Sequence, residues 1–390
     1  MKCVKLNQLC EINIGKTPSR SNSKYWGKGH KWLSIADMKS KYISETKEEI
    51  TDLAVSEANM KIVPKNTVLM SFKLSIGKIG ITTEEMYTNE AIASFPIIEK
   101  EKIISEYLYY VLKTLRYDNL SDRAVMGATL NKKKLNQIVI PLPSIIVQKK
   151  IVNLLNKAEE LIDKRKAQIE ALDQLTQSVF LEMFGDPVTN PNGWEIVNLQ
   201  DIADYFIGLT YKPNDVSDEG IVVLRSSNIQ NGVIDLNDIV RVKKEVNDKL
   251  LVKQNDILMC SRNGSARLVG KVALIPELEE RMTFGAFMTI IRSRYYCYLY
   301  NYFQSSAFRR QITSGATTTI NQITKKMLNY VKLPLPPTSL QNEFAHKVEQ
   351  IQHQKEILQT SLLELENMYN SLMQKAFKGE LFTEEKVSNL

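Results

Sequence analysis

Residues 140–148 read IPLPSIIVQ, and residues 333–341 read LPLPPTSLQ. The two stretches lie 193 residues apart, and each is followed by more than thirty residues that contain neither Pro nor Gly. Pro favours an extended start, whereas a long run rich in Leu, Glu, Lys and Gln favours a helix. In the second copy, Thr338 and Gln341 match the capping-box pattern. The sequence therefore predicts the same arrangement twice, an extended Pro-Leu-Pro followed by a long helix.

The repetition extends back to the start of the chain. At nearly the same spacing, VKLNQLCEI from Val4 returns as VNLQDIADY from Val197, and YLYYVL from Tyr107 returns as YLYNYF from Tyr298. We interpret the aromatic residues of YLYYVL and YLYNYF as the buried core face of a helix. The period far exceeds the ~20–50 residues of a solenoid unit, so the chain is a duplicated pair of domains. Ahead of each Pro-Leu-Pro, short β-branched runs, turns and an occasional helix indicate an α+β domain.

Both long helices carry a stripe of residues at alternating steps of four and three, which is the seam of a coiled coil. The predicted seam contains Ile151, Leu155, Ile162, Ile169, Leu172 and Val179 in the first helix, and Phe344, Val348, Ile351, Leu358, Leu362, Leu365 and Leu372 in the second. The stripe leaves open whether the helices pair within one chain or with a partner. Its polar members Arg165 and Lys355 are expected to extend toward solvent at the seam edge, with fixing of the register as the alternative.

Two domains, each followed by a helix of equal length, suggest an internal pseudo-two-fold. Packed antiparallel, the helices would hold the domains at opposite ends. At ~1.5 Å per residue the shared seam is a rod of roughly 48 Å, against ~34 Å for one turn of DNA. The predicted fold class is therefore α+β, with two tandem globular domains separated by two long antiparallel coiled-coil helices.

The composition is that of an ordinary globular protein, with 43% hydrophobic and 24% charged residues. No apolar run reaches the ~20 residues that span a bilayer, and the N-terminus lacks the apolar core of a signal peptide, so we expect no membrane partner and a cytoplasmic location. Cys3, Cys10, Cys260 and Cys297 have neither disulfide-framework nor zinc spacing, which predicts reduced thiols and no metal. The net charge of +7 permits an anionic partner such as DNA without requiring one.

The stretch Gly15-Lys16-Thr17 matches the end of a phosphate-binding P-loop. That pattern requires Gly where this chain has Cys10, and Pro18 disfavours the helix that should begin here. In the second repeat the same positions read Gly208-Leu209-Thr210, so the lysine does not recur. We therefore interpret the stretch as a scaffold turn. The methyltransferase, hydrolase and metalloprotease motifs are also missing, so we assign no catalytic residue and no cofactor.

Polar loop side chains are the remaining functional signal, because Arg, Lys, Asn, Gln, Ser and Thr bind phosphates and base edges. In the first domain the candidates for DNA contact are Lys16, Ser19, Arg20, Lys24, Lys73, Lys78, Thr129, Asn131 and Lys132. In the second domain they are Thr210, Lys212, Arg225, Ser226, Asn228, Arg262, Asn263, Arg267, Lys271, Thr317, Thr318, Thr319 and Asn321. Any one of them alone is more often a solvated loop residue.

Three stretches give nearly the whole chain a resemblance to a known family. They are LNQLCEINIGKTPSRSNSKYWG from Leu6, GATLNKKKLNQIVIPLPSIIVQKKIVNLLNKAEELIDKR from Gly127, and GATTTINQITKKMLNYVKLPLPPTSLQNEFAHKVEQI from Gly315. The order Gly-Ala-Thr, Pro-Leu-Pro, Gln and heptads occurs twice and resembles the specificity subunit of type I restriction–modification enzymes. Pro337-Thr338 replaces Ser144-Ile145, so the two helix starts are not equivalent.

The resemblance implies a target-recognition domain in residues 1–143, a central spacer helix in 144–185, a second recognition domain in 186–336, and a distal helix with a tail in 337–390. Each recognition domain would read one half of a bipartite, asymmetric site in double-stranded DNA. The helices would pair antiparallel, set the spacer and dock the modification subunits, two per chain. Methylation with S-adenosylmethionine would belong to those partners and ATP-driven cleavage to restriction subunits, which leaves this chain non-catalytic.

Two other classes of function remain open from the sequence. One is a tandem DNA-binding adapter or regulator without modification partners, which a neighbouring methyltransferase gene would argue against. The other is a nucleotide-dependent enzyme that uses residues 15–17, which loss of ATP binding in Lys16→Ala would support. The bases that each domain reads do not follow from loop composition, because they depend on loop geometry and DNA shape.

Overall fold

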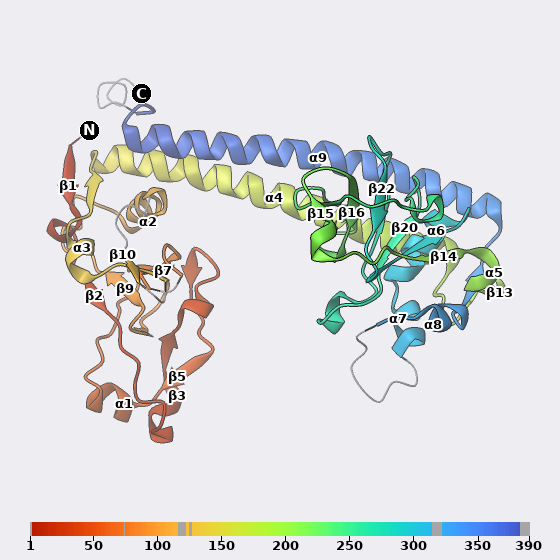
Figure 1. Cartoon of the computed structure of the whole chain (residues 1–390). Coiled ribbons are helices and arrows are strands. Elements are labelled where there is room, and N and C mark those ends of the chain that lie inside the picture. Colours follow the sequence, from red (N-terminus) through yellow and green to blue (C-terminus); the bar gives the residue numbers. More distant parts are fainter. Residues whose placement is uncertain (1, 74, 116–121, 125–126, 314–321, 383–390) are drawn as a thin grey trace. The chain divides into compact units, whose positions relative to one another are not determined.

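The computed structural model of the chain describes residues 2–382 apart from 74, 116–121, 125–126 and 314–321 (Figure 1). The chain divides into two compact units, Met1–Lys166 with Thr360–Leu390, and Ala167–Gln359. The division falls within the two long helices, α4 (Ile145–Phe184) and α9 (Thr338–Lys378). Each unit therefore holds half of each long helix and one domain of sheets and short helices, which confirms the predicted α+β class. The partition expected from the sequence differs, because it assigns each long helix to a segment separate from the two domains.

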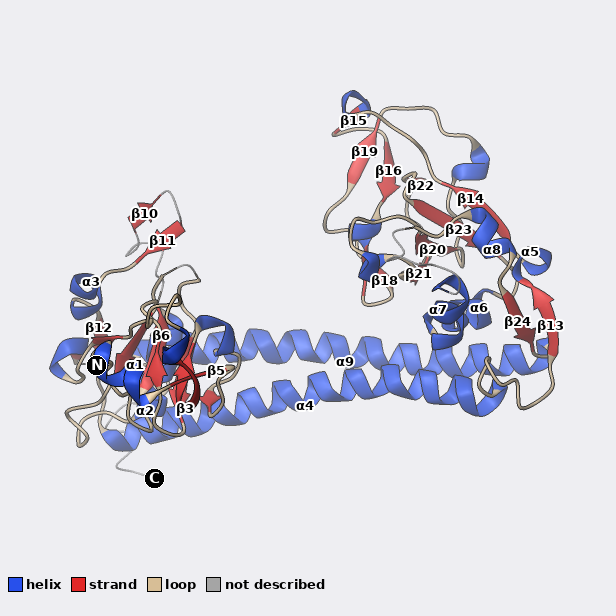
Figure 2. Ribbon diagram, turned by 90° about the horizontal axis from the view of Figure 1, so that it is seen from below, coloured by secondary structure: helices blue, strands red, loops and turns tan. Residues whose placement is uncertain are grey.

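The globular part of the first unit is built on two sheets (Figure 2). The larger has the order β2 (Asn13–Ile14), β9 (Ile92–Phe95), β6 (Val68–Ser71), β7 (Ile79–Thr82) and β4 (Tyr42–Ile43). The smaller has the order β5 (Glu48–Ile50), β3 (Trp26–Leu33) and β8 (Tyr87–Thr88). Two antiparallel pairs join β1 (Cys3–Lys5) to β12 (Val139–Pro141) and β10 (Asp122–Ala124) to β11 (Gly127–Thr129). The short helices are α1 (Asp52–Glu57), α2 (Ser105–Thr114) and α3 (Lys132–Asn136).

The second unit also has two larger sheets. One has the order β14 (Asp204–Ile207), β23 (Met288–Arg292), β20 (Ile257–Cys260) and β21 (Val272–Leu274). The other has the order β15 (Val216–Ser217), β19 (Val240–Val242), β16 (Ile221–Leu224) and β22 (Met282–Phe284). Two antiparallel pairs join β13 (Glu195–Asn198) to β24 (Lys332–Leu335) and β17 (Ile229–Gln230) to β18 (Val233–Ile234). The short helices are α5 (Leu199–Ile202), α6 (Tyr296–Gln304), α7 (Ser306–Thr313) and α8 (Lys325–Asn329).

The two units share one topology, which confirms the duplication. The order β2-β9-β6-β7 recurs as β14-β23-β20-β21, and β5-β3-β8 recurs as β19-β16-β22, with the last pair parallel in both cases. Each domain closes on itself, since its first strand pairs with the strand that precedes its long helix. Beyond this shared set, the first unit adds β4 and the second adds β15.

The predicted helix core lies on α2 and α6. Tyr107 and Tyr110 are fully buried in the first unit, as are Tyr298 and Tyr302 in the second. The hydroxyl of Tyr107 donates to the Pro141 carbonyl at 2.9 Å, and that of Tyr298 donates to the equivalent Pro334 carbonyl at 2.5 Å. Because a buried hydroxyl requires a partner, these tyrosines fix each helix against its Pro-Leu-Pro strand.

The recurring glutamines hold the start of each long helix. Gln148 is fully buried and its amide donates to the Pro143 carbonyl at 2.9 Å, while Gln341 donates to the Pro336 carbonyl at 2.7 Å. The capping-box interpretation of the second helix is therefore wrong: α9 begins at Thr338 itself, and the glutamine satisfies a carbonyl ahead of the helix. The Pro carbonyls are left without helical partners, and the buried amides supply them.

Within the first unit, the start of α4 packs antiparallel against the end of α9. Val147, Ile151 and Leu155 share one hydrophobic core with Met373 and Ala376. Further along α4, Lys166 pairs with Glu366 at 2.9 Å. Residue numbers therefore increase along α4 in the direction in which they decrease along α9, as in an antiparallel pair. The heptad stripe left open whether the helices pair within one chain or with a partner, and these contacts show pairing within one chain. Every predicted seam residue of both helices is buried or half-buried.

Within the second unit, the end of α4 packs against the start of α9. Phe180, Phe184 and Phe344 form an aromatic cluster with ring centroids 5.0 to 5.7 Å apart. Lys355 departs from the expectation that it reaches solvent, because it is only 7% exposed. Its ammonium donates to Asp173 on α4 at 2.5 Å, so the alternative role in helix register is the one the contacts favour.

Candidate nucleic-acid interface

The recurring Gly15 and Gly208 lie where the chain passes very close to a neighbouring segment. A Cβ atom on Gly15 would collide with the carbonyl oxygens of residues 88–89, and one on Gly208 with those of residues 284–285. Glycine is thus required at both positions because no other residue leaves room for the backbone to approach. The glycine recurs for a structural reason, as the scaffold interpretation predicts.

The backbone around Gly15 is also unable to serve as a P-loop. The Gly15 amide donates to the Ile92 carbonyl at 3.1 Å, and the Lys16 amide donates to the Thr88 carbonyl at 2.9 Å. A P-loop needs such N–H groups free to surround phosphates. The Lys16 ammonium donates to the Ala58 carbonyl at 3.2 Å. The nucleotide-site alternative therefore has no support in the geometry.

Several chain segments of the second unit converge on the residues that connect β22 to β23. The amide of Gly285 donates to the Leu224 carbonyl at 2.9 Å, and the amide of Ser261 donates to the Phe287 carbonyl at 2.9 Å. The amide of Ile323 in turn donates to the Ser261 carbonyl at 2.7 Å. These bonds bring the ends of β16 and β20, and the segment ahead of α8, to one place.

The first unit repeats this hydrogen-bond scheme. The amide of Asn89 donates to the Leu33 carbonyl at 3.0 Å, that of Phe72 to the Ala91 carbonyl at 2.9 Å, and that of Leu130 to the Phe72 carbonyl at 3.0 Å. The scheme aligns the two units residue by residue. We call this shared set of segments the convergent loops: residues 15–17, 33–34, 72–73, 89–91 and 130–131 in the first unit, and 208–210, 224–226, 261–263, 285–287 and 323–324 in the second.

The convergent loops bring together predicted contact residues from distant parts of the sequence. Arg262 follows Ser261 and so occupies the position that Lys73 has in the first unit. Asn131 caps α3 by accepting from the Lys134 amide at 2.9 Å, as Thr324 caps α8. Lys16 and Thr210 lie on the glycine turns. The backbone hydrogen bonds therefore bring together, within each unit, segments that are far apart in the sequence.

Arg20 is held in place before any ligand arrives. Its guanidinium makes two hydrogen bonds to Glu48, at 2.5 and 2.9 Å, and lies 3.6 Å from the centre of the Trp26 ring. The hydrogen bond from Arg20 lowers the pKa of Glu48. Because the pair is half-exposed, it orients Arg20 more than it stabilises the fold. The Trp26 ring in turn packs edge-on against Trp32, with ring centroids 5.0 Å apart.

The remaining candidates of the first unit differ in their surroundings. Ser19 pairs with Ser21 at 2.8 Å, and the Lys78 ammonium donates to the Ile35 carbonyl at 3.2 Å. Lys24 and Lys132 are exposed, Lys73 is half-buried with its ammonium near the Phe72 ring, and Thr129 lies in β11, where the side chain is outside the described part of the chain.

Arg225 and Asn228 form an internally bonded corner after β16. The Arg225 guanidinium pairs with Asp238 at 2.9 Å. The Asn228 amide donates to the carbonyls of Asp235 and Asp238, both at 2.9 Å, and its oxygen accepts from the Arg225 amide at 2.8 Å. Asn228 is 1% exposed, so a structural role accounts for it.

Arg262, Asn263 and Ser226 lie together on the convergent loops of the second unit. Both Nε and Nη2 of Arg262 donate to the Gln322 side-chain oxygen, at 3.0 and 2.6 Å. The Asn263 amide donates to the Ser226 hydroxyl at 3.3 Å. The other candidates here are exposed or half-buried, namely Thr210, Lys212, Arg267 and Lys271. Thr317, Thr318, Thr319 and Asn321 lie outside the described residues.

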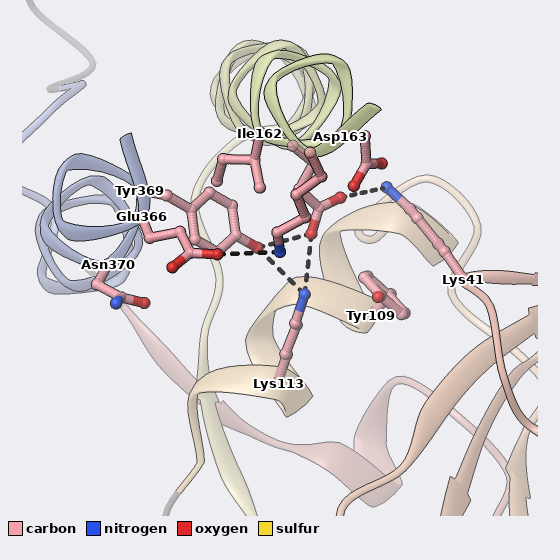
Figure 3. A pocket seen from close by; sticks show the side chains of 10 residues that line it. Lys41, Tyr109, Lys113, Ile162, Asp163, Glu366, Tyr369 and Asn370 are labelled. Atoms are coloured by element: carbon pink, nitrogen blue, oxygen red, sulfur yellow. Dashed lines mark hydrogen bonds and ion pairs between the residues drawn. The ribbon is translucent and has the colours of Figure 1, made fainter. Parts of the chain in front are cut away.

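Sequence reasoning missed a charged junction where α2 meets the two long helices in the first unit. Lys113 of α2 donates to the Glu159 carboxylate of α4 at 2.9 Å, and the Tyr369 hydroxyl of α9 donates to the same carboxylate at 2.7 Å. Lys41 lies 3.8 Å from it and donates to Tyr110 at 2.9 Å. Figure 3 shows Lys41, Lys113 and Tyr369 pointing toward one another across a hollow of about 440 Å³.

The junction shifts the pKa values of Glu159, Lys41 and Tyr110. Burial alone would raise the pKa of Glu159, but hydrogen bonds from Tyr110, Lys113 and Tyr369 outweigh burial and hold this pKa below its usual value. Burial lowers the pKa of Lys41 and raises that of Tyr110. Comparison of the repeats carries a sequence signal for the junction, because Lys113 in the first copy is replaced by Gln304 on the otherwise similar α6.

In the part of the chain that the structure describes, no helix combines the length and the apolar character needed to cross a membrane. Among the same residues, no three His, Cys, Asp or Glu side chains are grouped as metal ligands would be. Cys3, Cys10, Cys260 and Cys297 are free thiols.

Comparison with known proteins gives a consistent result along the chain. The sequence profile described as type I restriction modification DNA specificity domain matches residues 1–172 and 191–367. The type I restriction enzyme MjaIX specificity subunit of Methanocaldococcus jannaschii is 25% identical, over 98% of this chain and 93% of that protein. The EcoKI specificity subunit of Escherichia coli is 27% identical, over 89% and 82%.

Solved structures agree in fold. A chain from a structure of the assembly and conformational transition of the type I R-M system superimposes with a TM-score of 0.62 at 17% identity, covering 97% of this chain and 98% of that one. The type I restriction-modification S subunit of M. genitalium gives a TM-score of 0.52 at 15% identity, with 96% of each chain covered.

Proposed function

This chain belongs to the type I restriction modification DNA specificity domain family, and from that premise we infer that it is the sequence-specificity subunit of a type I restriction–modification enzyme. The observation that carries the inference is that the same sequence profile matches the chain twice, once on each repeat. Both relatives are specificity subunits, and the matches cover 93% and 82% of their lengths. This favours the function of a specificity subunit over that of a tandem adapter without modification partners.

We propose that each domain reads one half of a bipartite, asymmetric site in double-stranded DNA through its convergent loops. In support, the loops carry Lys16, Lys73 and Asn131 in the first unit and Arg262 and Asn263 in the second, and these are side-chain types that bind phosphates and base edges. The backbone scheme recurs while the side chains differ. Two domains with one scaffold and unlike side chains would read unlike half-sites.

We further propose that α4 and α9 set the spacer between the half-sites and dock the modification subunits, two per chain. Methylation and ATP-dependent cleavage then belong to modification and restriction subunits, and this chain supplies recognition without a catalytic residue. We expect the chain to meet its DNA in the cytoplasm.

A genome-wide map of methylated adenines, made with and without this gene, tests the function. We expect a split motif, two short half-sites separated by a fixed number of unspecified bases, whose methylation disappears on deletion and returns on complementation. A motif that stays methylated after deletion would refute the proposal. The map also identifies both half-sites and the spacer.

Exchange of residues 186–336 for the corresponding domain of a relative tests the division of labour. We expect one half of the methylated motif to change while the other half and the spacer stay the same. Exchange of residues 1–143 is the matched control and should change only the opposite half. A change in both halves, or in neither, would show that the domains do not read independently.

A further inference from the structure

One convergent-loop position differs between the units in a way that the scaffold does not explain. Ala91 accepts the hydrogen bond from Phe72 and is 4% exposed. The equivalent Phe287 accepts the same bond from Ser261 and is 59% exposed. A large aromatic side chain therefore projects from the second unit where the first unit has a buried methyl group.

The Phe287 side chain is carried by a firmly held backbone. Its carbonyl accepts from the amides of both Ser261 and Arg262, at 2.9 and 3.0 Å. The neighbouring Ala286 amide donates to the Leu209 carbonyl at 3.0 Å. A ring on such a backbone loses little conformational freedom when it meets a ligand.

The ring also has a polar neighbour suited to nucleic acid. The Arg262 guanidinium lies 5.7 Å from the centre of the Phe287 ring and is oriented by Gln322. Single exposed apolar residues are common on protein surfaces, so exposure alone carries no function. The position of Phe287 is the argument for function, because the ring lies beside Arg262 on the convergent loops, where we place the DNA contacts.

We propose that Phe287 is a specificity-determining residue of the second domain, whose ring contacts an apolar base surface beside the base or phosphate held by Arg262. The apolar surface is either a thymine methyl group in the major groove or the face of an unstacked base. This inference rests on the proposed function. It adds an apolar contact to a set of candidates that consists otherwise of polar side chains.

Selection from a library of duplexes with random sequence tests the proposal, with the full-length chain as wild type, Phe287→Ala and Phe287→Leu. We expect Phe287→Ala to lose preference at one or two adjacent positions of one half-site and to bind the wild-type consensus about 5- to 150-fold more weakly, since an aromatic contact with a base contributes ~1–3 kcal/mol. Phe287→Leu should retain part of the preference. Tyr330→Ala is the matched control, because Tyr330 is 72% exposed in the same unit and should leave selection unchanged.

Salt dependence separates this contact from a charge effect. Phe287→Ala should weaken binding without changing the slope of log K against log salt, whereas Arg262→Gln should reduce the slope if Arg262 binds a phosphate. A thermal unfolding midpoint for Phe287→Ala equal to that of wild type would show that the weaker binding does not come from unfolding.

Two modified duplexes distinguish the sources of the apolar surface. Replacement of thymines by uracil removes the methyl group and should weaken wild type, but not Phe287→Ala, if the ring contacts a methyl. Replacement of adenines by 2-aminopurine should give a fluorescence rise with wild type only, if the ring contacts an unstacked base. If neither duplex separates the proteins, or if selection by Phe287→Ala matches wild type within twofold, the proposal is wrong. If wild type itself selects no sequence, the proposed function falls with it.

Discussion

At the scale of single residues, the duplication separates structural positions from functional ones. Gly15 and Gly208 recur because the backbone leaves no room for a side chain, and the two tyrosines that contact Pro carbonyls recur because buried hydroxyls need partners. At equivalent places on the same scaffold, the first unit has Lys73 and the second has Arg262. Residues kept between the copies thus hold the fold, and residues that differ are where recognition is to be sought.

Gly208→Ala should destabilise the second unit. The new Cβ would overlap two carbonyl oxygens of the β22–β23 connection, and such overpacking costs about 1–3 kcal/mol. Urea unfolding at fixed pH measures the loss. Gly264→Ala is the control, because no described atom lies within 4 Å of its Cβ, and it should unfold like wild type. Equal stability of the two variants would contradict the account of the glycine turn.

At the scale of elements, the charged junction ties three helices together in the first unit. Glu159 of α4 receives hydrogen bonds from α2 and α9 at once. The equivalent place in the second unit has Gln352 instead of Glu159, and Lys355 reaches Asp173 there. The first part of α4 and the equivalent first part of α9 are thus fixed by different chemistry, although the two repeats share one sequence pattern.

Glu159→Gln should weaken the junction and remove part of its pH dependence. Because the folded pKa of Glu159 is lowered, its carboxylate stabilises the fold above the unfolded pKa of about 4.5. That stability is lost as the pH falls through the lower, folded value. We expect Glu159→Gln to unfold about 1–3 kcal/mol more easily at pH 7, with a smaller difference from wild type in acid.

Glu160→Gln is the matched control for that measurement. Glu160 is the next residue of α4, is exposed, and pairs only with Lys164 one turn away among the described contacts. Its substitution should leave the unfolding midpoint nearly unchanged at both pH values, because exposed ion pairs contribute little. Loss of stability in Glu160→Gln equal to that in Glu159→Gln would show that the junction has no special role.

Elements that depend on local pattern were predictable from the sequence, and contacts between distant segments were not. The start and end of α4 follow from Pro143 and Gly185, which bound a run with heptad spacing. The convergent loops depend on strand pairing over long separations, so loop composition alone could not show that Arg262 meets Gln322. Asn228 is a predicted contact residue and yet is buried, because burial is decided by neighbours that local sequence does not reveal.

At the scale of the whole molecule, the proposed spacer makes a quantitative prediction. Deletion of residues 163–169 from α4 and 356–362 from α9 removes one heptad from each helix and keeps the stripe in register. Seven residues correspond to ~10 Å of helix, or about three base pairs at ~3.4 Å each. The methylated motif should keep both half-sites and lose about three bases of spacer.

A replacement variant controls for effects of the deletion on folding. It restores seven residues of different sequence with the same heptad pattern at each place, and it should recover the original spacer. A methylation map that shows the same spacer in the shortened and restored proteins would refute the role of the helices as a ruler.

The division of the first unit between the two ends of the chain has a consequence for synthesis on the ribosome. Its core combines Val147 and Ile151 with Met373 and Ala376, so it stays incomplete until the last helix has been made. At ~5–20 residues per second, the intervening stretch of about 200 residues takes roughly 10–40 s to translate. During that time the part of the α4 apolar face that packs against α9 has no native cover. Nascent or prematurely terminated chains are therefore expected to be clients of chaperones and proteases, and to reach the soluble fraction only after the final helix emerges.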